Sequence, residues 1–133
     1  MKRVVGVGGV FFKAANPEKL REWYRDHLGF NVESWGGVVF ESDGADGANG
    51  ADGVAREEKI VWSLFPGDSN HFAPSKQPFM INYRVADLHA LLALLRAEGC
   101  AVDDKVDESD FGKFGWVMDP EGNRIELWEP PAV

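Results

Sequence analysis

The stretch MDPEGNRIELWEP, Met118–Pro130, decides the expected fold because it combines a tight turn with a short strand. In residues 119–122, DPEG, proline holds the second turn position and glycine the fourth, as a type I turn prefers. The residues after the turn alternate in polarity, and a strand directs successive side chains to opposite faces. The stretch is therefore predicted to form the turn and second strand of a β-hairpin.

The two faces of that strand differ in character. Ile125 and Leu127 share one face and require a hydrophobic core. Arg124, Glu126 and Trp128 share the other face, where a carboxylate stands beside an indole. The strand is therefore expected to separate a core from a surface that has a different role.

Composition limits the classes of partner. The chain has 133 residues, of which 44% are hydrophobic, and a formal net charge of -8. These values predict one compact, soluble domain, 1–133, and argue against nucleic acid or an anionic membrane as partner, since both need clustered Lys and Arg. No apolar run approaches the roughly 20 residues of a membrane helix. Cys100 is the only cysteine, which fits a reducing cytoplasm.

The same order of elements occurs twice along the chain. In the first copy, a β-branched and aromatic run, 4–14, is followed by a helix with Asn16 as its N-cap and Gly29 as its stop. Three predicted strands follow this helix, at 30–36, 37–42 and 59–65.

The second copy repeats this plan. A strand at 79–85 precedes a helix that begins after Asp87 and ends at Gly99, and three strands follow, at 100–106, 113–119 and 123–129. An offset of 71 residues places Asn16 on Asp87. A copy of roughly 65 residues buries too little surface to be stable alone. The copies, 1–66 and 78–133, are therefore expected to pack together.

Between the third and fourth strands of the first copy lies a segment rich in Gly and Ala, 42–58. Its acidic and amide residues recur every third position, whereas an EF-hand places oxygen ligands at alternate positions. We therefore expect a flexible, solvated insertion and not a calcium site.

The duplicated βαβββ plan, the helix end WYRDHLGF at 23–30 and the hairpin DPEGNRIELWEP at 119–130 resemble the vicinal oxygen chelate superfamily. This superfamily includes glyoxalases, bleomycin-resistance proteins and extradiol dioxygenases. The resemblance covers nearly the whole chain. It implies an α+β fold of two helices and eight strands, in which curled mixed sheets surround a ligand cavity, and it implies that homodimers are common.

For metal enzymes of the superfamily, the resemblance implies ligands on the first and last strands of each copy. The last-strand ligand falls on Glu126, but the other positions fall on Gly9, Met80 and near Trp62. These three residue types are poor ligands for catalytic divalent metals. We therefore expect no metal and no cofactor. His71, in the connector between the copies, is interpreted as a solvated loop residue, with a ligand contact as the alternative.

The cavity implied by the resemblance has aromatic walls and a few polar anchors, as small-molecule pockets usually do. The predicted ligand-binding residues are Phe11, Trp62, Met80, Asn82, Arg84, Glu126 and Trp128. An alternative is that the charged pair Arg84 and Glu126 fills a closed barrel. The sequence does not decide which face Trp116 takes.

These observations favour a metal-free small-molecule-binding protein of the glyoxalase and bleomycin-resistance type. The alternative is a cavity enzyme, such as a lyase, isomerase or dioxygenase-like protein, that uses Glu126 as general base or as a metal ligand. The sequence does not identify the ligand, and it does not establish whether the protein is catalytic.

Overall fold

A computed structural model describes residues 2–41 and 59–132 of the chain. The described residues form two helices and seven strands: β1 (Val4–Ala14), α1 (Pro17–Leu28), β2 (Val38–Glu41), β3 (Lys59–Pro66), β4 (Phe79–Val85), α2 (Leu88–Ala97), β5 (Ala101–Ser109), β6 (Gly112–Met118) and β7 (Arg124–Glu129). The insertion expected at 42–58 lies outside the described residues.

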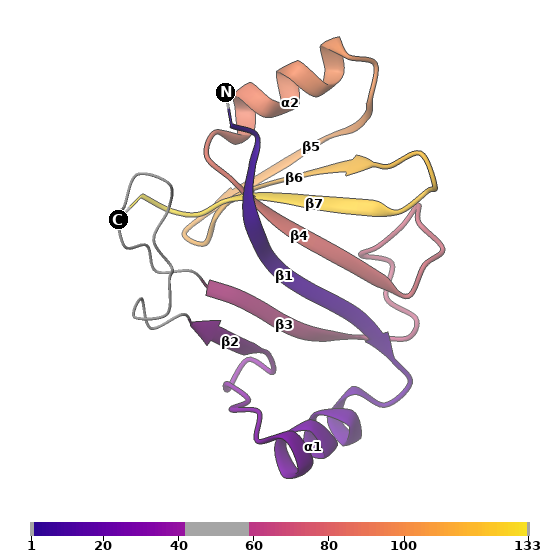
Figure 1. The fold of residues 1–133 in the computed structure, drawn as a ribbon. Helices are drawn as coiled ribbons and strands as arrows, with labels where there is room; N and C mark the ends of the chain where they lie inside the picture. Colours follow the sequence, from indigo (N-terminus) through magenta and orange to yellow (C-terminus); the bar gives the residue numbers. More distant parts are fainter. Residues whose placement is uncertain (1, 42–58, 133) are drawn as a thin grey trace.

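All seven described strands belong to one curled sheet with the order β2-β3-β1-β4-β7-β6-β5 (Figure 1). The strands that open the two copies, β1 and β4, pair antiparallel in its middle. Each of them pairs in parallel with the last strand of its own copy, β1 with β3 and β4 with β7. The predicted α+β class, with sheets that curl, is confirmed.

One of the eight expected strands is absent from the described part of the chain, because residues 30–33 form no regular structure and residues 34–36 form a turn and bend. The Glu33 N–H donates to the Gly37 carbonyl at 2.8 Å, and the Gly36 N–H donates to the Glu33 carbonyl at 2.9 Å. Gly36 has a φ of 97°, which glycine tolerates better than other residues. The backbone groups of this segment are thus used within the turn and not for strand pairing.

The predicted helix caps are present. The side chain of Asn16 accepts from the Lys19 N–H at 3.1 Å, and Gly29 ends α1 in the left-handed conformation. Asp87 accepts from the Ala90 N–H at 3.1 Å at the start of α2.

The two helices differ in burial. Leu20 and Tyr24 of α1 pack towards the sheet, whereas Trp23 and Leu28 are exposed. On α2, Leu91 and two further leucines are buried.

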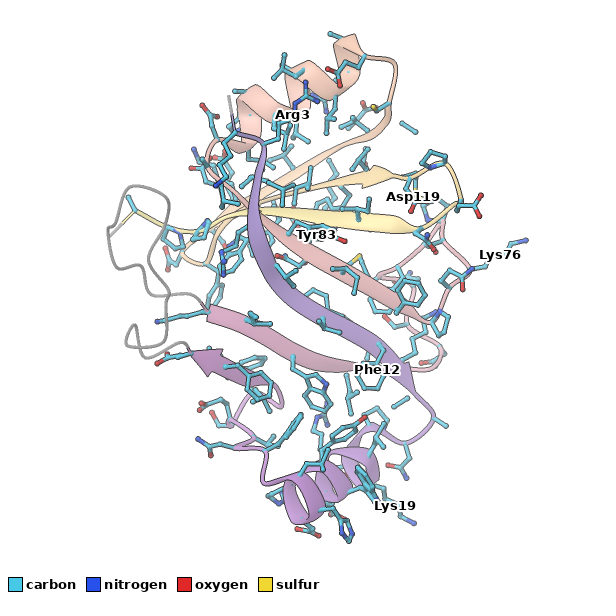
Figure 2. All side chains as sticks on the ribbon, in the orientation of Figure 1. Arg3, Phe12, Lys19, Lys76, Tyr83 and Asp119 are labelled. Carbon is cyan, nitrogen blue, oxygen red and sulfur yellow. The ribbon has the colours of Figure 1, made fainter. Side chains whose placement is uncertain are left out.

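Each helix covers one hydrophobic cluster of the sheet. The cluster beneath α2 contains Leu127 with Ile125 packed against it, as the alternation of the last strand predicted. The cluster beneath α1 contains Trp62, and Phe12 packs against it from β1 (Figure 2). A third cluster lies on the opposite face of the sheet, where Phe72 of the connector between β3 and β4 is fully buried.

Two further findings concern membrane-spanning helices and the cysteine. No helix among the described residues is both long enough and apolar enough to cross a membrane. Cys100 is exposed and free.

Candidate functional site

A cavity of about 580 Å³ opens on the concave face of the sheet. Its lining consists largely of five aromatic side chains, with one lysine and one amide among the other residues: Gly8, Phe11, Trp35, Val39, Lys59, Val61, Asn82, Phe111, Phe114 and Trp128. Ligand pockets commonly have volumes of roughly 300–1,000 Å³ and mostly apolar walls with few polar groups. The cavity has the size and composition of a small-molecule site.

The floor of the cavity depends on a glycine of β1. The pairing of β1 with β4 shifts register between Val7 and Gly9, as at a β-bulge, and leaves Gly8 as the extra residue. A Cβ atom at Gly8 would collide with Oδ1 of Asn82 and would lie 2.9 Å from Cε3 of Trp128. Any side chain at this position would therefore displace the cavity wall.

A buried polar network lies beside this floor. The Asn82 amide Nδ2 donates to Oε2 of Glu126 at 2.8 Å, and the indole Nε1 of Trp116 donates to Oε1 at 3.1 Å. Asn82, Glu126 and Trp116 are adjacent in register on β4, β7 and β6. Both oxygens of the carboxylate thus accept hydrogen bonds from fixed donors. These hydrogen bonds offset the free-energy cost of burying a polar group.

His71 of the connector approaches the same carboxylate. Its Nε2 lies 3.7 Å from Oε1 of Glu126, and its ring stacks on Phe65 with an interplanar angle of 2°. The solvated-loop interpretation of His71 therefore needs revision, because the ring is partly covered and faces the network. Whether it contacts a ligand stays a prediction.

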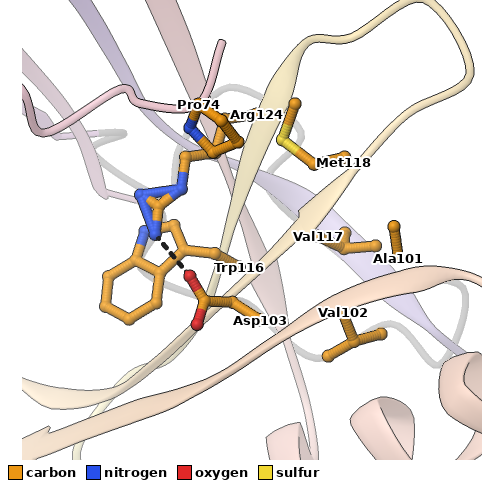
Figure 3. A pocket seen from close by; sticks show the side chains of 8 residues that line it. All are labelled: Pro74, Ala101, Val102, Asp103, Trp116, Val117, Met118 and Arg124. Atoms are coloured by element: carbon orange, nitrogen blue, oxygen red, sulfur yellow. Dashed lines mark hydrogen bonds and ion pairs between the residues drawn. The ribbon is translucent and has the colours of Figure 1, made fainter.

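The connector is held in place by Arg124 of β7. Its Nη1 donates to the His71 carbonyl at 2.8 Å, its Nη2 pairs with Oδ2 of Asp103 at 3.1 Å, and its guanidinium lies 4.8 Å from the centre of the Trp116 ring. Figure 3 shows the ion pair of Arg124 with Asp103, beside the Trp116 ring, at a second cavity of about 210 Å³ that also borders Pro74 of the connector. Arg124 thus links the connector to two strands.

Three of the predicted site residues line the main cavity: Phe11, Asn82 and Trp128. Met80 is fully buried on the same face, in the cluster with Phe72. Glu126 lies behind Asn82 in the polar network.

Arg84 lies on the concave face, but its side chain crosses β1 towards β3 and does not reach towards the network. Its Nη1 donates to the backbone carbonyl of Lys59 at 2.9 Å, near the rim of the cavity. Glu126 accepts hydrogen bonds from Asn82 and Trp116, so Arg84 is not needed to hold that carboxylate.

The predicted position of Trp62 is wrong. Its ring packs against Tyr24 of α1, with ring centres 4.9 Å apart, on the face of the sheet opposite the cavity. Its neighbour Val61 lines the cavity instead. An error of one residue in register moves a strand side chain to the other face, and this error arose because the sequence placed the position only approximately.

Several lining residues were not predicted: Gly8, Trp35, Val39, Lys59, Val61, Phe111 and Phe114. Phe114 could have been found, because it pairs with Trp128 across β6 and β7 and stacks on it with an interplanar angle of 8°. Trp35 and Phe111 come from turns, where side-chain direction has no simple periodicity.

Lys59 brings a positive charge to the rim of the cavity, and its Nζ lies 3.6 Å from a carboxylate oxygen of Glu41 on the neighbouring strand. Both side chains are about half exposed, so solvent screens the pair. The rim is therefore polar, in contrast to the aromatic walls.

The hairpin that positions Glu126 is stabilised by Asp119 in its turn (Figure 2). The Asn123 side chain donates to one oxygen of Asp119, and backbone N–H groups of Asn123 and Glu121 donate to the other. These hydrogen bonds, with that from the Asn123 side chain the largest cause, lower the pKa of Asp119 from its ordinary value of 3.8. The turn thus favours the ionised carboxylate.

The residues of the concave face do not fit a catalytic metal ion. Val61, Gly9, Asn82 and Glu126 form one row across β3, β1, β4 and β7, and only its last two members carry a polar side chain. The carboxylate of Glu126 already accepts two hydrogen bonds. Among the described residues, no three His, Cys, Asp or Glu side chains are grouped so that they could hold a metal ion.

Solved structures share this fold at low sequence identity. Methylmalonyl-CoA epimerase from Mycobacterium tuberculosis is 22% identical, with a TM-score of 0.60, and the match covers 99% of this chain and 92% of that one. A single-residue variant of the Streptomyces coelicolor epimerase, in complex with 2-nitronate-propionyl-CoA, is 17% identical with a TM-score of 0.67, over 97% of this chain and 99% of that one.

A glyoxalase/bleomycin resistance protein/dioxygenase superfamily member from Vibrio splendidus 12B01 is 14% identical, with a TM-score of 0.57, over 92% of this chain and 97% of that one. At these identities the likeness concerns the fold alone. No curated protein matches the chain by sequence.

The model of one protein family, described as a glyoxalase-like domain, matches residues 9–128. This range includes most of both repeated copies and reaches every strand that lines the cavity. The chain therefore belongs to the glyoxalase-like domain family, as the resemblance of its helix end and last hairpin to glyoxalases and their relatives predicted.

Proposed function

We propose that this glyoxalase-like domain is a small-molecule-binding protein that holds a planar, partly apolar organic ligand without a metal ion. The observation that carries the proposal is the cavity of about 580 Å³ with five aromatic side chains in its wall. Aromatic rings favour offset-stacked and edge-on contacts with a flat ligand, and these contacts add to the gain from burying apolar surface.

The polar groups of the cavity support orientation of such a ligand. Asn82 is the one amide in the described lining, and Lys59 is the one charged residue there. Asn82 is anchored by Glu126, so its position is fixed before a ligand arrives. Solved neighbours of the same fold hold acyl-CoA molecules, which supports a small organic ligand.

A titration with 2-naphthol, a flat and largely apolar molecule, followed by NMR of the indole N–H signals, tests this proposal. We expect the signal of Trp128 to shift and Trp128→Ala to weaken binding by about tenfold or more, because the large ring contributes much of the contact area. Trp23→Ala is the matched control, since Trp23 is 50% exposed on α1. Absence of binding, or equal loss in both variants, would contradict the proposal.

A second candidate is an enzyme in which Glu126 acts as general base. The observation that favours it is the 3.7 Å approach of His71 Nε2 to Glu126 Oε1 beside the cavity. Incubation with methylmalonyl-CoA in D₂O would reveal a base-catalysed reaction as deuterium uptake at the carbon next to the thioester. Uptake that Glu126→Gln abolishes would support the enzyme, whereas equal uptake with and without protein would leave the binding function preferred.

We further propose that the protein acts in the cytoplasm as a homodimer and binds neither nucleic acid nor membranes. The single exposed cysteine and the net charge of -8 support the location and the absence of polyanionic partners. Exposed apolar residues at the start of β1 support self-association.

A further inference from the structure

We infer that the cavity selects ligands that carry an N–H or O–H hydrogen-bond donor, and that Oδ1 of Asn82 is the group that reads this donor. The inference rests on the proposed binding function and makes it more specific. It is carried by one unsatisfied atom: Oδ1 of Asn82 is buried and has no hydrogen-bond partner among the described residues.

The orientation of the amide follows from its surroundings. A carboxylate only accepts hydrogen bonds, and Trp116 Nε1 only donates, so Oε1 of Glu126 is occupied by the indole and Oε2 requires a second donor. Nδ2 of Asn82 supplies the second donor at 2.8 Å. A flipped amide would place Oδ1 against the carboxylate oxygen, which is repulsive. Oδ1 must therefore point away from Glu126.

An Asn82 Oδ1 atom that points away from Glu126 points towards the wall of the cavity. A Cβ atom built on Gly8 would meet Oδ1 of Asn82, and its next neighbour would be Trp128. Gly8, Asn82 and Trp128 all line the cavity. Oδ1 of Asn82 thus occupies the space that the missing side chain of Gly8 leaves. It lies beside the indole of Trp128, on which a flat ligand can stack.

Leaving this oxygen unpaired is costly. Asn82 is 2% exposed, and a buried polar atom without a partner loses its hydration without compensation. A ligand donor would remove that penalty on binding. A ligand with an acceptor at the same place would instead oppose two lone pairs, and the carboxylate of Glu126 behind the amide would add repulsion for an anion.

The chemical class is therefore a flat, partly apolar molecule with an N–H or O–H group on its edge, such as an indole, a phenol or an aromatic amine. Aromatic acids and ethers of the same size belong to the class that the cavity rejects. Sites built around a polar group discriminate strongly against analogues that leave this group unpaired.

An isosteric probe pair tests the inference on the unchanged protein. Indole and benzofuran have nearly the same shape, but indole carries N–H where benzofuran carries an acceptor oxygen. We expect indole to bind about tenfold more tightly, as measured by calorimetry and by the NMR shift of Trp128. Equal affinity of the two probes would overturn the inference and leave the binding function standing. Failure of both probes to bind would overturn the binding function together with the inference.

A double variant checks that Asn82 is responsible. Asn82→Leu with Glu126→Gln removes the amide and the buried charge together, so that no carboxylate is left with a missing donor. We expect this variant to bind indole and benzofuran with equal affinity, whereas Trp23→Ala keeps the tenfold preference. A preference that persists in the double variant would contradict the role of Asn82. If the double variant does not fold, the probe pair on the unchanged protein still decides.

Discussion

Glu126 is 5% exposed, and the reason for a carboxylate in that position lies on two other strands. The indole that donates to the Glu126 carboxylate belongs to Trp116 of β6. It does not belong to Trp128, which lies two residues after Glu126 on β7. Trp128 instead donates to the Phe111 carbonyl at 2.8 Å. Alternation along one strand predicted the face of Glu126 correctly, but it could not identify cross-strand partners, since these depend on the register of the neighbouring strands.

This arrangement predicts the effect of Glu126→Gln. The glutamine amide has one oxygen for two donors, from Asn82 and Trp116, so one donor loses its acceptor. We expect the free energy of unfolding to fall by about 1–3 kcal/mol, as for other buried unsatisfied groups. Urea unfolding measures the change, and Glu121→Gln in the exposed hairpin turn is the control, expected within about 0.5 kcal/mol of the parent. Equal stability of the two variants would show that the network contributes little.

At the residue scale, Phe11 and Asn82 were placed by alternation from the strand positions that the resemblance implied, and both line the cavity. Their role in ligand binding stays a prediction. Trp62 was placed by counting along the chain without a fixed register, and it was assigned to the wrong face. The unpaired oxygen of Asn82 depends on a β-bulge in β1, which no periodic pattern in the sequence encodes.

At the scale of elements, the β6–β7 hairpin was predicted most accurately, since its turn carries strong local signals. The Gly122 N–H donates to the Asp119 carbonyl at 3.1 Å, and Gly122 has a φ of 83°. Residues 30–36 contain glycine and aromatic residues as well, yet they contain a turn that hydrogen bonds internally. A short apolar run does not show by itself whether it forms a strand, because its sequence does not reveal a partner strand. This ambiguity explains why eight strands were expected and seven are described.

Asp119 gives the hairpin a pH dependence. Hydrogen bonds lower the pKa of this carboxyl in the folded protein, so the ionised turn stabilises the fold above the pKa of the unfolded chain. The contribution is lost as the pH falls through the lowered pKa. Asp119→Ala is therefore expected to lower the Tm at pH 7, and the difference from the parent should narrow in acid, below the ordinary value of 3.8.

Calorimetry between pH 7 and the acid range measures this trend. Asp104→Ala, at an exposed position of β5, is the matched control and is expected to change the Tm little at neutral pH. A constant difference between Asp119→Ala and the parent at all pH values would show that the carboxylate is not the source of the stabilisation.

The connector between β3 and β4 was expected to be a solvated loop, with a ligand contact of His71 as the alternative, but it also contributes a core. Phe72 is fully buried against Met80 and Trp116 on the concave face. Phe72→Ala is expected to cost about 3–5 kcal/mol, as for other fully buried phenylalanines. Phe111→Ala, at a position with 77% exposure, should change stability by less than about 0.5 kcal/mol. Urea unfolding distinguishes the two, and a small effect at Phe72 would mean that the connector packs only loosely.

At the scale of the whole molecule, the duplicated pattern predicted that the two copies pack together, because a copy of roughly 65 residues buries too little surface to be stable alone. The curled sheet was implied by the resemblance. The duplicated pattern did not predict how the cavity wall is completed. Strands supply Phe11, Phe114 and Trp128, while Trp35 and Phe111 arrive from turns that are distant in sequence. Such contacts depend on the global curvature of the sheet, and local periodicity carries no information about it.

Self-association is a prediction at the same scale. Val4, Val5 and Val7 at the start of β1 are 43%, 39% and 39% exposed, and Val4 also lines a groove with Leu91 and Leu95 of α2. A second copy of the chain would cover such apolar surface. Light scattering at micromolar concentration is expected to give twice the monomer mass of 14.7 kDa. A monomer mass under these conditions would contradict the dimer.

The last prediction concerns metal content. The row that crosses the middle of the sheet offers Val61, Gly9, Asn82 and Glu126, and a catalytic ion typically requires three protein ligands of suitable type. The purified protein is therefore expected to carry well below one equivalent of Zn, Ni, Fe or Mn by elemental analysis. Its thermal unfolding should be the same with and without a chelator, because no folding energy comes from a bound ion. A stoichiometric transition metal, lost together with Tm on chelation and absent from Glu126→Gln, would overturn the metal-free proposal and make the enzyme the preferred function.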